Sequence, residues 1–181
     1  MKKFELTNEF VTNMFGTKLF RIRALVEFGD VEAGELGGYV EKESNLGHDD
    51  NAWVYGNAQV SGDARVYGNA WVYGNAWVYG DAQVSGDARV CGDARVCGNG
   101  DYAYAHGFGS VNRTTTFFRL KDGGVGVRCG CFYGTLAQFR DKIRETHGET
   151  KKAQEYLMLA DLMELRFEED ENEVGNRKYV E

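Results

Sequence analysis

The chain of 181 residues has no proline, few cysteines and no long apolar run. The lack of proline excludes collagen-like and polyproline-rich structures. No stretch approaches the roughly 18 apolar residues of a membrane span, and residues 1–5 lack the apolar core of a signal peptide. Four cysteines are too few for a small secreted protein built on disulfides: Cys91, Cys97, Cys129 and Cys131. We therefore expect a cytoplasmic protein with free thiols.

The sequence also lacks a basic stripe. Its formal net charge is −7, and acidic and basic residues are mixed along the chain. This pattern disfavours general binding to nucleic acids or to anionic membranes, because both need clustered lysine and arginine. A local arginine pocket for a small anion remains open. With 43% hydrophobic and 27% charged residues, the composition is that of a globular protein rather than a disordered one.

Glycine, by contrast, is abundant, with 24 residues against an average usage of about 7%. Residues 51–98 form uninterrupted hexads of the type [Asn/Asp]-Ala-x-Val-x-Gly: NAWVYG, NAQVSG, DARVYG, NAWVYG, NAWVYG, DAQVSG, DARVCG and DARVCG. Alanine and valine lie two residues apart, so they point to the same side of an extended chain, which must be the interior. Glycine and Asn/Asp mark the corners. A short fixed period of this kind predicts a solenoid.

The hexads resemble those of the hexapeptide-repeat family, whose fold is a left-handed parallel β-helix with three hexads in each triangular coil. The resemblance implies the handedness. Irregular hexads around residues 39–46 and 101–107 extend the predicted solenoid to about four coils. We therefore predict a mainly β fold with an N-terminal β cap over residues 1–38, the β-helix over 39–106 and a small α+β module over 107–181.

Stacking each residue on the one 18 positions later brings aromatic side chains together on two outer faces of the solenoid. The residues concerned are Trp53, Tyr55, Trp71, Tyr73, Trp77 and Tyr79. Exposed aromatic patches usually mark an interface. We expect a homotrimer contact here, with a ligand platform or a surface for a foreign partner as the alternative.

The C-terminal module begins with two strand candidates, residues 114–120 and 125–131, around an Asp-Gly turn. The expected pairing sets Phe118 opposite Val127 and leaves Phe117 between Arg119 and Arg128 on the other face. Such a face suits a flat anionic ligand, although it could equally pack on the solenoid or on a neighbouring subunit. Two amphipathic helices follow, the first capped by Thr135 and the second near residues 151–169.

Polar residues just before the hairpin suit contacts with phosphate or ribose. The predicted ligand-binding residues are Ser110, Asn112, Arg113, Thr114, Thr115, Phe117, Arg119 and Arg128. The hypothesis is a non-catalytic protein, trimeric, that binds a small anionic ligand of the nucleotide type or blocks a partner protein. It needs no cofactor.

The layout as a whole resembles small hexapeptide-repeat proteins of phages and prophages. The matching segments are LFRIRALVEFGDVEAGELGGYVEKESNL (19–46), the hexads, GSVNRTTTFFRLKDGGVGVRCGCFYGTLAQF (109–139) and ETHG (145–148). This resemblance implies a setting in counter-defence, in the host-cell cytoplasm, through sequestration of a nucleotide-type signal or inhibition of a host protein.

The alternative function is acyl transfer from acetyl-CoA, which the larger hexapeptide-repeat family implies. That chemistry needs a positioned base, and His106 is the candidate because it lies where the last coil meets the C-terminal module. The hexads, however, run without the loop that carries such a histidine in the family. A metal site is not expected, because Cys129 and Cys131 have no second Cys/His pair at zinc-like spacing.

Overall fold

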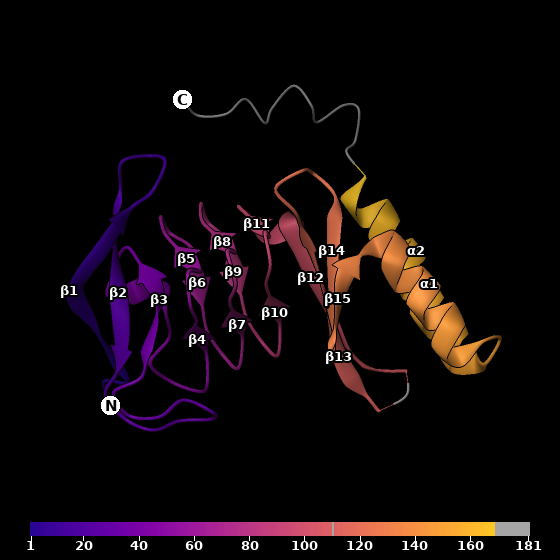
Figure 1. Ribbon diagram of the computed structural model, residues 1–181, viewed down its shortest axis with the longest axis horizontal. Helices are drawn as coiled ribbons and strands as arrows, with labels where there is room; N and C mark the ends of the chain where they lie inside the picture. Colours follow the sequence, from indigo (N-terminus) through magenta and orange to yellow (C-terminus); the bar gives the residue numbers. More distant parts are fainter. Residues whose placement is uncertain (110, 169–181) are drawn as a thin grey trace.

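The computed structural model describes residues 1–109 and 111–168. It is mainly β, with a β-solenoid of about three turns between an N-terminal sheet and a C-terminal sheet that is backed by two helices (Figure 1). The predicted solenoid and the two predicted helices are confirmed. None of the helices in the described residues is long and apolar enough to cross a membrane.

The elements follow one another in three groups. The N-terminal group comprises β1 (Phe4–Thr12), β2 (Lys18–Ala24), β3 (Leu36–Val40) and the short 3-10 helix η1 (Glu43–Asn45). The solenoid group comprises β4 (Trp53–Val54), β5 (Gln59–Val60), β6 (Arg65–Val66), β7 (Trp71–Val72), β8 (Trp77–Val78), β9 (Gln83–Val84), β10 (Arg89–Val90) and β11 (Arg95–Val96). The C-terminal group comprises η2 (Asn99–Asp101), β12 (Tyr102–Phe108), β13 (Arg113–Arg119), β14 (Val125–Cys129), β15 (Phe132–Thr135), α1 (Leu136–His147) and α2 (Lys151–Phe167).

The solenoid strands stack in parallel at intervals of 18 residues. Trp53 pairs with Trp71 and Trp71 with Arg89, while Gln59 pairs with Trp77 and Trp77 with Arg95. The alanine and valine of every hexad are 0% exposed, so they form one continuous core along the solenoid. The stacking and the inward direction of alanine and valine are therefore as the hexads predict.

The hydrogen-bond ladder between turns has a direction. The Asp63 N–H donates to the Gly80 carbonyl (2.8 Å), and the Arg65 N–H donates to the Ala82 carbonyl (2.9 Å). Backbone N–H groups therefore point toward the following turn, and carbonyls point toward the preceding one. The first turn must consequently find donors for its carbonyls, and the last turn must find acceptors for its N–H groups.

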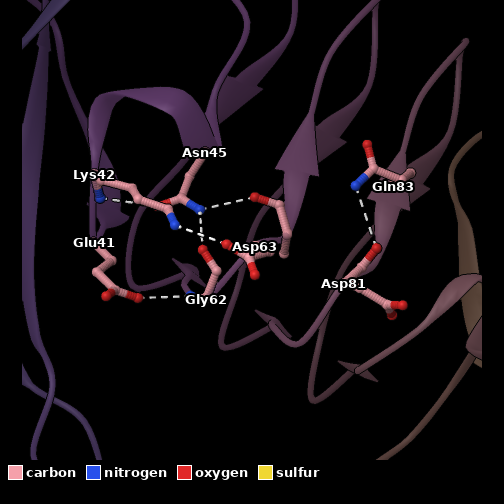
Figure 2. Close-up of polar contacts among 8 residues, drawn as sticks. Glu41, Lys42, Asn45, Gly62, Asp63, Asp81 and Gln83 are labelled. Atoms are coloured by element: carbon pink, nitrogen blue, oxygen red, sulfur yellow. Dashed lines mark hydrogen bonds and ion pairs between the residues drawn. The ribbon is translucent and has the colours of Figure 1, made fainter.

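Side-chain donors serve the first turn. The Asn45 amide donates to the carbonyls of Gly62 (3.1 Å) and Ala64 (2.8 Å), and Asn45 is itself fully buried (Figure 2). Its Oδ1 accepts a bond from the Lys42 N–H (2.9 Å), which fixes the amide in the orientation that presents the donor. Asn45 thus replaces the missing backbone of a preceding turn at this corner.

At a neighbouring corner the donor is a lysine. The Lys3 Nζ donates to the carbonyls of Ala52 (2.8 Å) and Asp50 (3.3 Å) and lies over the Phe28 ring, although the residue is only 3% exposed. Burial lowers the pKa of Lys3 to about 8, while the nearby carboxylates of Asp50 and Asp49 act in the opposite direction.

At the last turn the roles are opposite to those at the first turn: side-chain acceptors bond to its backbone N–H groups. The Gln83 N–H donates to Asn99 Oδ1 (2.8 Å), the Arg89 N–H to Thr116 Oγ1 (3.0 Å) and the Cys97 N–H to Asp101 Oδ2 (2.9 Å). The C-terminal module therefore closes the solenoid with hydrogen bonds as well as with apolar contacts.

Residues 101–107 differ from the expectation that they form an irregular solenoid hexad. They lie largely in β12, which pairs antiparallel with β13 and so joins the C-terminal sheet, with Tyr102 opposite Phe118. The segment lacks the Ala-x-Val-x-Gly spacing that turns a corner, so the chain continues as one longer strand. Phe118 is fully buried and joins the solenoid core, which it closes at this end.

The N-terminal sheet closes the other end and corrects the prediction for Trp53. This residue is fully buried, with Phe28 at 5.3 Å and Phe4 at 6.2 Å between ring centroids. An outer position in the first turn is thus covered by the chain itself, because the cap wraps around the turn as well as over its end. Trp53 is not on an exposed oligomer face.

Replacing the Asn45 amide, a hydrogen-bond donor, by a carboxylate, which only accepts, should destabilise the fold. We expect Asn45→Asp to lower the free energy of unfolding by about 2–4 kcal/mol, because two buried carbonyls lose their donor and face a carboxylate. Urea denaturation would measure it. The control is Asn57→Asp at an exposed corner, where other hexads carry aspartate, and it should change stability little. Equal losses in both variants would contradict the capping role of Asn45.

Lys3 should make stability depend on alkaline pH. Between its folded pKa of about 8 and its unfolded value near 10.5, the unfolded chain binds more protons than the folded one. Stability should therefore rise with pH through this window, by on the order of 2 kcal/mol relative to Lys3→Gln, which does not titrate. Denaturation of both proteins at pH 7.5, 9 and 10 would test this, and parallel pH curves would contradict it.

Candidate functional site

The β13–β14 hairpin decides where the predicted ligand residues lie. Phe117 pairs with Val127, Phe118 with Gly126 and Arg119 with Val125, one residue away from the predicted register. The predicted pairing is therefore wrong. The turn is one residue shorter than expected, because the Leu120 N–H donates to the Gly124 carbonyl (2.8 Å) and only residues 121–123 lie between the strands. A shift of one residue exchanges the two faces of a strand.

Phe117 and Arg119 consequently lie on the helix side of the sheet, away from Arg128. Phe117 is fully buried in the second core, against Phe139 of α1 at 6.1 Å. Arg119 Nε lies 3.4 Å from an Asp101 carboxylate oxygen, and its Nη2 donates to the Phe167 carbonyl (3.1 Å). Both residues therefore hold the C-terminal module together, and the predicted seat between the two arginines does not form.

Arg128 lies on the other side of the sheet, next to the solenoid face that β4, β7 and β10 form. Its guanidinium is 5.8 Å from the centre of the Tyr73 ring, and its Nη1 donates one long bond to the Cys131 carbonyl (3.4 Å). Its Nε is buried and has no hydrogen-bond partner in the described residues. Arg128 therefore makes few contacts with the rest of the described chain.

A second arginine lies on the same solenoid face. Arg89 lies 4.2 Å above the Trp71 ring, and both Arg89 and Arg128 act electrostatically on the Tyr73 hydroxyl. Burial, and then the neighbouring Cys91, nevertheless raise the pKa of Tyr73. We define the arginine–aromatic face as Trp71, Tyr73, Arg89, Cys91 and Arg128. Neither arginine forms an ion pair among the residues that the structure describes.

The arginine–aromatic face has a definite chemical capacity. Guanidinium groups offer several N–H donors in one plane and recognise phosphate or carboxylate groups. Aromatic rings beside them accept a flat apolar or heterocyclic group. The buried Cys91 thiol adds no reactive group, because burial raises its pKa. The face is thus suited to binding an anion with a ring rather than to covalent chemistry.

The remaining predicted ligand residues are not brought together. Thr115 is buried and donates to Cys129 Sγ (3.1 Å), and Thr114 Oγ1 lies 2.8 Å from His106 Nδ1. Asn112 is exposed in a turn with φ of 49°, and Arg113 is half-buried near Gly130. Ser110 lies outside the described residues.

The predicted acyl-transfer base has an open environment. The His106 side chain is 59% exposed, and its Nδ1 faces both Thr114 and, at 4.0 Å, Asp87. The contact with Thr114 and the approach to Asp87 therefore use the same ring nitrogen, so they do not form a relay across the imidazole. Among residues 1–109 and 111–168, no group of three His, Cys, Asp or Glu side chains is placed to hold a metal ion.

The other predicted interface residues are half-buried on two solenoid faces. Tyr55 packs against Trp71 at 5.3 Å on the first face. On the second face, Arg95 lies 4.1 Å above Trp77, and Tyr79 contacts Phe15 of the β1–β2 loop at 6.3 Å. The two faces thus present the same arginine-on-tryptophan pair, but only the first also receives Arg128 from the C-terminal sheet.

One further hollow, with a volume of about 380 Å³, lies beside the third solenoid face. It is lined by Gln83, Asn99, Tyr102, Ala103, Tyr104 and Arg166. Its polar groups largely bond to one another, since the Tyr102 hydroxyl donates to the Gln83 carbonyl (2.6 Å). It contains one cation where the arginine–aromatic face has two, so the latter is the stronger anion site.

The comparisons with known proteins concern the repeat. The model of the YdcK beta solenoid repeat matches four overlapping segments, residues 58–74, 64–80, 70–86 and 82–98. The central part of the chain is similar to this repeat. A search of the curated proteins finds no match to the chain. The repeat match agrees with the β-solenoid and assigns no ligand or reaction to it.

The importance of Arg89 could not be recognised from the hexads alone. The 18-residue stacking correctly placed it above Trp71 on the first face. Its relation to Arg128 depends on how the hairpin packs against the last turn, with Thr116 accepting from the Arg89 N–H. The sequence did contain one signal. Thr116 and Phe118 lie two residues apart, so they share one side of β13, and this side faces the solenoid.

Replacing each of the two hairpin arginines should show that Arg119 stabilises the fold and that Arg128 contributes little to stability. We expect Arg119→Ala to lower the free energy of unfolding by about 2–4 kcal/mol, because the largely buried Asp101 carboxylate loses the Arg119 guanidinium and the Phe167 carbonyl loses its donor. Arg128→Ala should cost under about 1 kcal/mol, because its partners are few. Chemical denaturation of both variants measures this difference. A larger loss for Arg128→Ala would overturn the assignment of roles.

Proposed function

We propose that this chain is a non-catalytic binding protein for a small anionic ligand with a flat ring, of the nucleotide type. The observation that carries the proposal is the position of two arginines on one face. The Arg128 guanidinium lies 5.8 Å from the centre of the Tyr73 ring, Arg89 lies 4.2 Å above the Trp71 ring, and neither has an ion-pair partner among the described residues. The Arg128 guanidinium is half-buried, and such groups are normally paired, while the exposed Arg89 adds a second positive charge on the same face. An anion from outside the chain would supply the missing negative charge.

The rings beside these arginines define the rest of the ligand. Trp71 and Tyr73 are half-buried, and Trp71 already holds the Arg89 guanidinium on its face at 4.2 Å. A phosphate between the arginines would leave an attached base or other flat group next to these rings. A nucleotide-like ligand satisfies both requirements, whereas an uncharged one would use only the aromatic part.

The proposal extends to the assembly and its setting. We propose that the solenoid is left-handed and forms a cytoplasmic homotrimer through aromatic side chains of its outer faces, among them Trp77 and Tyr79. In this arrangement each ligand site lies where a C-terminal module meets a solenoid. The resemblance to phage proteins favours a role in counter-defence, by sequestering a nucleotide signal or by blocking a host protein.

Removing either arginine should abolish ligand binding and leave the fold intact. We expect Arg89→Ala and Arg128→Ala each to weaken the binding of a mononucleotide or cyclic dinucleotide at least tenfold, equivalent to about 1.4 kcal/mol per charge-assisted contact. Isothermal titration calorimetry or quenching of Trp71 fluorescence would measure this loss. Native mass spectrometry would show any anion that copurifies and disappears in the variants.

The matched control is Arg95→Ala. Arg95 lies over Trp77 at 4.1 Å in the same way, but on the second face and without Arg128. Nucleotide binding should therefore persist in this variant. Equal weakening by Arg95→Ala, or unchanged binding by both test variants, would contradict the site. Turnover of acetyl-CoA that is lost in His106→Ala would instead support acyl transfer.

A further inference from the structure

Helix α2 carries apolar side chains on two opposite sides. The inner side packs in the second core and consists of Ala153, Tyr156, Ala160, Met163 and Phe167. The other side, which we call the outer stripe, consists of Met158, Leu162 and Leu165, with exposures of 72%, 53% and 67%. Residues at spacings of four and three lie on one side of a helix, so these three form a continuous row.

A row of this kind needs a partner helix. An ordinary surface helix is apolar toward the core and polar toward water, whereas α2 is apolar in both directions. The alternating four- and three-residue spacing is that of the seam between two packed helices. The outer stripe is separate from the arginine–aromatic face, which lies on the solenoid side of the C-terminal sheet, so its partner is independent of the proposed ligand.

We propose that the outer stripe pairs with the outer stripe of a second copy of this chain, with the two α2 helices parallel. The charged side chains Asp161 and Arg166 beside the stripe favour that orientation. One flank of the stripe carries Asp161 and Glu164, and the other carries Arg166 and, three turns earlier, Glu155, whose carboxylate accepts a bond from the Gly109 N–H (3.2 Å). In a parallel pair Asp161 of each helix lies beside Arg166 of the other. In an antiparallel pair, acidic flanks would face each other.

The charged groups are available for this contact. Asp161 and Glu164 share Arg140 within the chain, yet their side chains remain 71% and 56% exposed. Arg166 is exposed and makes one long bond, from Nη2 to the Asn99 carbonyl (3.4 Å). Three apolar side chains per copy bury less than the roughly 1,200 Å² of a standard interface. The association is therefore weak and concentration-dependent.

Sedimentation velocity of the full chain over a range of concentrations tests the contact. Leu162→Glu should abolish the concentration-dependent association of the wild-type protein while leaving its melting temperature unchanged, because Leu162 is exposed. The control Ala137→Glu adds the same charge to an exposed position of α1 and should associate like the wild type. Equal association of Leu162→Glu and wild type, or no association of the wild type, would overturn the proposal.

Two further variants test the parallel orientation. Arg166→Glu should weaken the association several-fold, because its new carboxylate would face Asp161 of the other copy. Unchanged or stronger association would show that Arg166 does not lie beside Asp161 of the other copy and would overturn the parallel arrangement. Leu165→Cys, in a background with Cys97→Ser and Cys131→Ser, should form an intermolecular disulfide, because parallel helices set each Leu165 beside its counterpart. Failure to cross-link at concentrations where this variant associates would also overturn the parallel arrangement.

The same experiments separate this contact from the proposed trimer. A trimer held by aromatic solenoid faces would persist in Leu162→Glu and lose only its further association. Nucleotide binding at Arg89 and Arg128 should be unaffected by the α2 variants.

Discussion

The direction of the backbone ladder is the constraint on which the rest of the structure depends. Every turn of the solenoid offers carbonyls toward the N-terminus of the stack and N–H groups toward its C-terminus. A stack of identical hexads therefore cannot close itself at either end. Donors from Asn45 and Lys3 complete one end, and oxygens of Asn99, Asp101 and Thr116 complete the other. The two flanking regions differ chemically because one end of the solenoid exposes carbonyls and the other exposes N–H groups.

Strand β13 connects this closure to the candidate site. Phe118 fills the end of the solenoid core, while Phe117, the next residue back, belongs to the core shared with the helices. One strand thus separates two cores, and its alternation assigns each neighbouring side chain to one of them. Because Arg128 pairs with Thr116, it is directed to the solenoid side, where Arg89 lies. The proposed anion site is a consequence of sealing the last turn.

The two outward features of the C-terminal module have different characters. The arginine–aromatic face combines uncompensated charge with rings and favours a small ligand. The outer stripe of α2 is a short apolar row with complementary charges on its flanks and favours another helix. They lie on different sides of the module, so ligand binding and self-association can vary independently.

The hexads by themselves determined the solenoid, its 18-residue stacking and its alanine–valine core, because a two-residue side-chain period and a fixed corner leave few other packings. The capping residue Thr135 and the helical spacing of apolar residues over 151–169 likewise predicted both helices. Tertiary structure decided the hairpin register, the burial of Trp53 and Phe117, and the position of Arg128 on the same side of the C-terminal sheet as Arg89. Each of these depends on how long strands pack against a solenoid end, and a shift of one residue, which local sequence specifies weakly, exchanges every side chain between two faces.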